Sequence, residues 1–345
     1  MNELEFLGSP GSPYSMKMRA YLRYRKIPYK MLRGLMTGIE GYPKSKTPML
    51  PTFYLPKEDG DLEAVIDSTP IIRRLENEYS LKKTLPNDNR IRFIVDLIED
   101  YADEWLTKVM FHYRWAIEHN AKHVAPKLVY WMDHTISEKI ANEMVASFSK
   151  RQKDRLKYVG SNEITKGTIE NSYTRFITIL DSLLSQHGFV VGKQPSAADF
   201  AIYGQLSQLT RVEPTSSEIC SNLSPRVMAW VDRVSDASDI SFDSQHWSDF
   251  DEVCSNLQPL LSEIGKTYIP LLITNANALK QDDNTVKLQI DGIEWIQDTF
   301  TYQGKCLIAL AQSYTSLNDS EKASLYKCLQ GTGCDVLIDE FNKAS

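Results

Sequence analysis

Four hydroxyl-bearing residues gather near the start of the chain, where they could act on a ligand. Ser9, Ser12, Tyr14 and Ser15 follow the apolar segment 4–7 in a stretch rich in glycine and proline. A serine that caps a helix lies beside unpaired backbone N–H groups and the positive end of the helix dipole. Such a place binds an anion and stabilises a thiolate relative to a thiol.

The elements around this turn must hold the hydroxyls in place. The apolar pattern predicts a strand over residues 4–7 and then a helix that carries Met16, Ala20 and Tyr24. Residues 27–32 predict a second strand, parallel to the first, in a right-handed βαβ unit. The same pattern fits an ordinary strand–turn–helix connection in which Ser12 or Ser15 does no more than cap the helix.

Two further places could contact a ligand. Leu50 and Pro51 stand directly before a predicted strand, and a cis bond between them would turn the Leu50 backbone toward a ligand. Asp67 and Ser68 precede Thr69 and Pro70 at the start of another predicted helix. That pair is either a plain helix cap or a second helix start that holds a charged end group of a ligand.

From about residue 85 the pattern becomes helical. After a linker at 86–88, apolar residues recur at helical spacing, which predicts one long helix over 91–116 and helical regions over 126–155, 169–186 and 225–234. Ser196 and Asp199 have the spacing of a capping box before a buried helix.

The end of the chain is predicted to be mostly helical. The pattern predicts a helix over 257–272, ended or kinked by Pro270, a strand of a small hairpin over 286–290, and helices over 300–314 and 319–330. These residues could cover a site, extend a dimer interface or bind a partner. The sequence leaves those three roles open.

Composition limits the class of protein. With 345 residues, 42% apolar and 24% charged, the chain is long enough for two or more globular domains. The net charge is −6 and the Lys and Arg residues are scattered, which argues against a nucleic-acid site. No apolar run approaches the roughly 18 residues of a membrane span, and the acidic N-terminus does not resemble a signal peptide. A cytoplasmic location is expected.

The cysteines predict neither redox chemistry at the first turn nor a metal site. The five are Cys220, Cys254, Cys306, Cys328 and Cys334, an odd number without a C-x-x-C pair, so reduced thiols are expected. No His or Cys spacing suggests zinc, and no metal is expected. Because no cysteine precedes Cys220, a dithiol or a mixed disulfide at the first turn is excluded. No Ser-His-Asp arrangement is evident either, so a serine nucleophile is not expected.

Four of these segments together resemble the cytosolic glutathione transferase superfamily, over roughly residues 3–235. Residues 12–19 look like the active-site turn of its Ser-type classes. Residues 50–53 look like its cis-proline segment, Asp67-Ser68 like its acidic-Ser pair, and residues 192–200 like its buried capping box. The chain departs from the family in two ways: it continues well beyond the helical domain, and it has an unusually long insert after residues 99–105. In these features it is more similar to bacterial members of the family than to the well-studied classes.

The resemblance implies a fold in three parts. An α/β thioredoxin-like domain would span residues 1–85 and bind glutathione. An all-helical domain would span 86–240, and a mostly helical C-terminal extension would span 241–345. It also implies a homodimer.

The resemblance further implies roles at the site. The Ser12 hydroxyl would contact the glutathione sulfur, with Ser15 as the alternative and Ser9 and Tyr14 less favoured. Leu50 beside Pro51 would pair with the cysteinyl part of glutathione, and Asp67 and Ser68 would hold its γ-glutamyl end.

Three functions follow from that reading. In the first, glutathione is a co-substrate whose thiolate attacks a small apolar electrophile. In the second, the protein is a glutathione-dependent peroxidase or dehalogenase. In the third, it is a non-catalytic binding protein. One or two of Trp105, Phe111, Tyr113 and Trp115 could line an electrophile pocket between the domains, although a stripe at helical spacing more often lies in a core.

Overall fold

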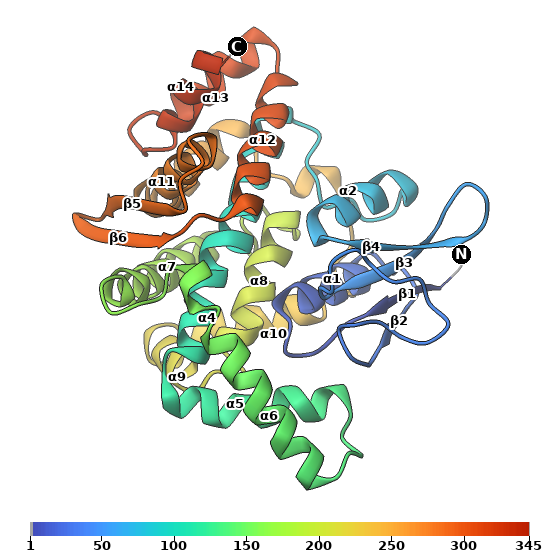
Figure 1. Cartoon of the computed structure of the whole chain (residues 1–345). Helices are drawn as coiled ribbons and strands as arrows, with labels where there is room; N and C mark the ends of the chain where they lie inside the picture. The colour runs from blue at the N-terminus through green and yellow to red at the C-terminus, as the bar shows by residue number, and fades with distance from the viewer. Residues whose placement is uncertain (1–2, 345) are drawn as a thin grey trace.

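The N-terminal part is a four-stranded mixed sheet in a computed structural model that describes residues 3–344 (Figure 1). The strand order is β2-β1-β3-β4, with β1 and β2 parallel and the other pairs antiparallel. The bounds are β1 (Leu4–Leu7), β2 (Tyr29–Leu32), β3 (Thr52–Pro56) and β4 (Leu62–Ile66). Leu7, Thr52 and Ile66 lie in one row across the three strands β1, β3 and β4.

That row matters because each predicted contact segment adjoins it. The turn with Ser12 follows β1, Pro51 directly precedes β3, and Asp67 directly follows β4. The register therefore brings the three segments to one edge of the sheet. The helices α1 (Pro13–Tyr24) and α2 (Ser68–Glu78) begin at this same edge.

The middle of the chain is entirely helical, as predicted. The helices are α3 (Asn89–Tyr101), α4 (Thr107–Trp115), α5 (Glu118–Met132), α6 (Glu138–Lys153), α7 (Lys166–Gln186), α8 (Ala197–Leu209), α9 (Pro214–Leu223) and α10 (Pro225–Ser235). The buried α8 begins with the predicted capping box: Oδ2 of Asp199 accepts the Ser196 N–H at 2.8 Å, and Oδ1 accepts the Val190 N–H at 2.9 Å.

Two expectations for this region are corrected. The long helix predicted over 91–116 is interrupted by a π-helical segment, η1 (Ala102–Leu106), between α3 and α4. The helical region predicted over 126–155 begins earlier, at Glu118, and consists of the two helices α5 and α6, so that Pro126 lies inside α5. The buried face of α5, which includes Val124 and Leu128, packs in a small apolar cluster on both sides of Pro126. This packing carries the helix through the proline.

The two domains touch backbone to backbone. The helix α8 packs along α1, and a Cβ built on Gly204 would lie only 2.7 Å from the carbonyl oxygen of Pro13. Glycine is required here because any side chain would collide with the α1 backbone. The buried helix α8 therefore holds in place the start of α1, directly after the turn that carries Ser12.

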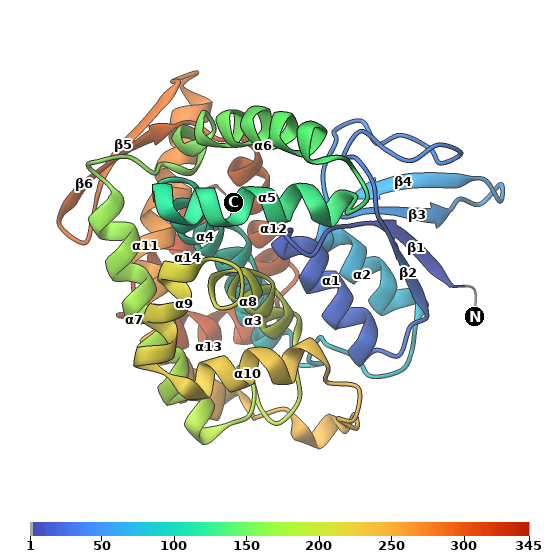
Figure 2. The same ribbon diagram turned by 90° about the horizontal axis from the view of Figure 1, so that it is seen from below.

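The C-terminal extension folds onto the helical domain as helices and a hairpin. It consists of α11 (Phe250–Lys280), β5 (Thr285–Ile290), β6 (Ile293–Asp298), α12 (Thr301–Thr315), α13 (Asp319–Leu329) and α14 (Asp335–Ala344). α11 packs against α7, and α11, α12 and α13 pack against α3 (Figures 1 and 2). Pro270 does not end α11, because buried residues such as Tyr268 and Leu272 continue the helix past it. The predicted fold class is confirmed; the boundaries at 85 and 240 remain predictions.

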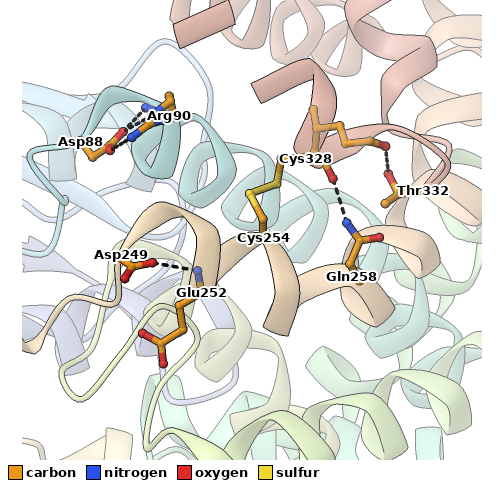
Figure 3. Close-up of a disulfide and its surroundings, with 9 residues drawn as sticks. Asp88, Arg90, Asp249, Glu252, Cys254, Gln258, Cys328 and Thr332 are labelled. Atoms are coloured by element: carbon orange, nitrogen blue, oxygen red, sulfur yellow. Dashed lines mark hydrogen bonds and ion pairs between the residues drawn. A yellow bond between two sulfur atoms is a disulfide. The ribbon is translucent and has the colours of Figure 1, made fainter. Parts of the chain in front are cut away.

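A disulfide fastens the extension internally. Cys254 of α11 and Cys328 of α13 are bonded across 74 residues of sequence (Figure 3). One turn after Cys254, the Gln258 side chain donates a hydrogen bond of 2.8 Å to the Cys328 carbonyl. The expectation of reduced thiols is therefore wrong for this pair, since helix packing and not sequence spacing brings the two together. Cys220, Cys306 and Cys334 are free and buried.

Removal of this disulfide is expected to destabilise the protein. A cross-link over a loop of this length restricts the unfolded chain, and the usual contribution is about 2–4 kcal/mol. The paired change Cys254→Ser and Cys328→Ser should lower the free energy of unfolding by that amount in urea titrations. Dithiothreitol should lower the unfolding midpoint of the wild type and leave that of the double variant unchanged. An equal response of both proteins would contradict the prediction.

Within residues 3–344, no helix is both long enough and apolar enough to cross a membrane.

Candidate functional site

Ser12 stands at the start of α1 with its hydroxyl partly exposed. It is the N-cap residue, and its Oγ accepts the N–H of Ser15 at 3.2 Å. The same hydroxyl donates to the carbonyl oxygen of Leu50 at 3.4 Å. The structure thus brings Ser12 and Leu50 together at the positive end of the α1 dipole, where an anion would be stabilised.

The other three hydroxyls of the turn have different surroundings. Ser15 is fully buried, and its Oγ accepts the Ser9 N–H at 3.3 Å, so it holds the turn in shape. The Ser9 Oγ accepts the N–H of Gly11 at 3.3 Å. The Tyr14 hydroxyl donates to the backbone oxygen of Asp103, at 2.7 Å, in the helical domain. Ser12 is thus the serine of this turn that is not buried.

Leu50 reaches Ser12 through a cis peptide bond to Pro51, the geometry that the sequence suggested. Because Pro51 precedes β3 and β3 pairs with β1, the Leu50 backbone lies across from the turn that follows β1.

Asp67 caps α2 in a strained backbone conformation. Its φ of 80° lies in the left-handed region, which is costly for a residue with a side chain. Its Oδ1 accepts the Thr69 N–H at 3.3 Å, and Ser68 beside it is buried. The predicted pair therefore lies at a helix start, at the same sheet edge as Ser12 and Leu50.

Sequence reasoning missed a contact to Asp67 from the far end of the chain. The hydroxyl of Tyr302, in the first turn of α12, donates to Oδ2 of Asp67. The two residues are 235 positions apart, and no motif or periodic pattern marks Tyr302. The extension therefore reaches the candidate site.

A buried ionic cluster, also missed, lies behind the helix starts. The Lys17 ammonium of α1 is fully buried and contacts Glu99 Oε1 at 2.8 Å and Asp103 Oδ2 at 2.5 Å. Burial alone would raise the pKa of Glu99, but Arg73 and Lys17 hold it below its usual range. Lys17 thus ties the first helix of the sheet domain to α3 and the π-helical segment.

A neighbouring carboxyl, that of the half-buried Asp100, is expected to make stability depend on pH. Burial raises its pKa to about 7, although the hydroxyl of Tyr268 donates a hydrogen bond to Oδ2. The unfolded carboxyl has a pKa of about 4, so the folded protein holds this proton where the unfolded chain has lost it. The stability from this group is fully present below about pH 4 and is lost as the pH rises through about 7.

Asp100→Asn removes this titration and keeps an acceptor for Tyr268. We expect the free energy of unfolding of the wild type, relative to that of the variant, to fall as the pH rises from about 5 to about 8. Urea unfolding of both proteins across that range measures the difference. A constant difference between the two would contradict the assignment.

A groove of about 520 Å³ lies beside α5, and one of its lining residues, Trp131, contacts Gly11 of the Ser12 turn. Its walls are apolar and aromatic with basic edges, from Arg33, Pro126, Lys127, Tyr130, Trp131, His134 and Arg211. Gly11, next to Ser12, packs directly against Leu128 and Trp131 of α5, which is the reason for glycine there. No Asp or Glu is among the described residues that line the groove, although the chain carries a net charge of −6.

The aromatic residues suggested for an electrophile pocket lie elsewhere. Trp105, Tyr113 and Trp115 are buried in the core, and Phe111 packs partly buried against it. None of the four lines the groove. In residues 3–344, no group of three or more His, Cys, Asp or Glu side chains is placed to hold a metal ion.

Two known protein families match parts of this chain. Residues 6–83 match the family described as the glutathione S-transferase N-terminal domain, and residues 136–241 match the glutathione S-transferase C-terminal domain. The two matches together span more than half of the chain. The protein belongs to the glutathione transferase superfamily, as the resemblance of its motifs predicted.

Solved structures with a similar fold are distant in sequence. A glutathione S-transferase from Methylobacterium radiotolerans, in complex with glutathione sulfonate, is 17% identical over 72% of this chain and 99% of its own, with a TM-score of 0.37. The Tau class enzyme of mango is 18% identical over 73% and 95%, with a TM-score of 0.39. A glutathione transferase from Phanerochaete chrysosporium is 15% identical over 70% and 100%, with a TM-score of 0.44. No curated protein matches the chain in sequence.

Proposed function

We propose that this protein is a glutathione transferase that binds glutathione and activates its thiol for attack on a small electrophile. The observation that carries the proposal is the half-exposed Ser12 hydroxyl at the start of α1, 3.4 Å from the Leu50 carbonyl oxygen. Asp67 and Ser68 at the start of α2 share that sheet edge and would hold the γ-glutamyl end. Family membership supports glutathione as the ligand.

Ser12 needs to lower the pKa of the glutathione thiol by only a small amount. A free thiol has a pKa of about 8.5, so little thiolate exists at neutral pH. A hydrogen bond to a charged group contributes about 1.5–3 kcal/mol. At about 1.36 kcal/mol per unit, the Ser12 hydroxyl would lower the pKa of the bound thiol by about one to two units. The dipole of α1 acts in the same direction.

The nucleophilic sulfur must come from the ligand. No cysteine precedes Cys220 in the sequence, and the three free cysteines, Cys220, Cys306 and Cys334, are buried, which raises the pKa of each thiol and keeps it protonated. In the proposed reaction the thiol proton leaves to solvent, the thiolate sulfur bonds to the electrophilic carbon, and the leaving group departs with its bonding electrons. A peroxidase or dehalogenase would use the same thiolate, so substrate tests must separate these reactions.

We place the electrophile in the groove beside Gly11. The rings of Tyr130 and Trp131 supply an apolar wall, and Arg33, Lys127 and Arg211 supply positive charge at its edge. An aromatic electrophile that carries a carboxylate or sulfonate suits this lining better than a neutral one of the same size.

Calorimetry with glutathione, followed by a conjugation assay with chlorodinitrobenzene, tests the proposal. Binding together with turnover is the expected result. Absence of glutathione binding would overturn the proposal, and binding without turnover on several electrophiles would make the chain a non-catalytic binding protein. The homodimer that the resemblance implies is also proposed, and sedimentation tests it.

A further inference from the structure

The start of α12 is built against the candidate ligand site. Tyr302 lies in the first turn of this helix, and its hydroxyl donates to Oδ2 of Asp67. The other oxygen of Asp67, Oδ1, accepts the Thr69 N–H. Both oxygens of the carboxylate are therefore oriented, one by α2 itself and one by the extension.

The two hydrogen-bond donors to the Asp67 side chain are both neutral groups. They are the Thr69 amide and the Tyr302 hydroxyl, and among residues 3–344 no Lys, Arg or His forms an ion pair with the carboxylate. Burial and the adjacent Asp67 carboxylate raise the pKa of Tyr302, so its hydroxyl stays protonated and remains a donor. An oriented carboxylate without a cationic partner suits a ligand ammonium group.

Tyr302 is held firmly enough to orient another group. The backbone of Phe300, the N-cap residue of α12, is fixed from both sides by the buried Asn275 of α11. The Phe300 N–H donates to Asn275 Oδ1 at 2.9 Å, and Asn275 Nδ2 donates to the Phe300 oxygen at 3.0 Å. Next to Tyr302, Gln303 is fully buried. The position of the hydroxyl is thus set by packing within the extension.

We propose that Tyr302 is a positioning residue for the ligand: it fixes the Asp67 carboxylate that receives the α-ammonium group of the γ-glutamyl end. This inference rests on the proposed function and gives the C-terminal extension a part in the site. It makes affinity for the γ-glutamyl end depend on a residue of the extension, beyond position 241.

Tyr302→Phe removes only the hydroxyl and tests the inference. We expect the Kd for glutathione to rise about tenfold and KM to rise with it, while kcat changes little, because the sulfur is held at Ser12. Tyr314→Phe is the matched control: Tyr314 is a buried tyrosine on the same helix, and its hydroxyl contacts Asn342 at 3.2 Å, away from the site. This control should bind glutathione as the wild type does.

A ligand without the amine separates positioning from general support of the fold. Glutathione in which hydrogen replaces the α-amino group should bind the wild type and Tyr302→Phe equally well. In a double-mutant cycle, Tyr302→Phe should add no loss of glutathione affinity to that of Asp67→Asn. Unchanged glutathione affinity in Tyr302→Phe, or an equal loss for both ligands, would overturn the inference while leaving the proposed function in place. A wild type that binds no glutathione would overturn both.

Discussion

Ser12→Ala is expected to lower kcat/KM for conjugation about 10- to 100-fold near neutral pH. The estimate follows from the loss of a hydrogen bond to a charged sulfur, about 1.5–3 kcal/mol. The pKa of the bound thiol should rise by about one to two units, so the activity of the variant should recover as the pH is raised. A pH–rate profile measures this shift directly.

Two matched variants make the test specific. Ser12→Thr keeps a hydroxyl at the cap and should retain most of the activity, which also controls for the loss of the helix cap itself, about 1 kcal/mol of stability. Ser15→Ala removes the buried hydroxyl that accepts the Ser9 N–H and should leave the thiol pKa in place. If Ser15→Ala shifts the pH–rate profile and Ser12→Ala does not, the assignment of Ser12 is wrong.

Lys17→Met is expected to lower the free energy of unfolding by about 3–5 kcal/mol. The fully buried ammonium contacts Glu99 and Asp103, and its removal leaves Asp103 without this cation and Glu99 with Arg73 alone. These carboxyls would then take up protons more readily in the folded state. The variant should therefore regain stability as the pH falls, relative to the wild type.

Lys30→Met is the control for this change. Lys30 also pairs with a carboxylate, Glu3 Oε2 at 2.7 Å, but its side chain is 58% exposed. An exposed pair of this kind contributes about 0–1 kcal/mol, so the control should unfold close to the wild type. Urea titrations of both variants provide the comparison. Equal midpoints for Lys17→Met and Lys30→Met would show that the buried cluster does not hold the domains together.

The elements that depend on local chemistry could be predicted from the sequence. The Ser196 and Asp199 spacing specified a capping box, and the box forms with both carboxylate oxygens engaged. The strand, turn and helix around Ser12 form as predicted, because alternation and Gly/Pro punctuation act within a few residues. The cis bond before Pro51 likewise occurs where an X-Pro step precedes a strand.

What the sequence did not reveal depends on tertiary packing. Pro126 and Pro270 are local helix breakers, yet each lies inside a helix whose buried face continues past it. Lysine is a residue type that is usually exposed, yet Lys17 is fully buried because α3 and η1 supply its partners. Tyr302 reaches Asp67 only because α11 positions the start of α12.

The close backbone contact between Gly204 and Pro13 affects how a ligand can enter and leave the site. Two backbones in direct contact resist sliding, so we expect the sheet and the helical bundle to move together and not to open and close as separate bodies. We therefore expect ligand exchange to depend on local motion at the rim, where residues such as Leu35 and Met49 of the long loop between β2 and β3 are exposed.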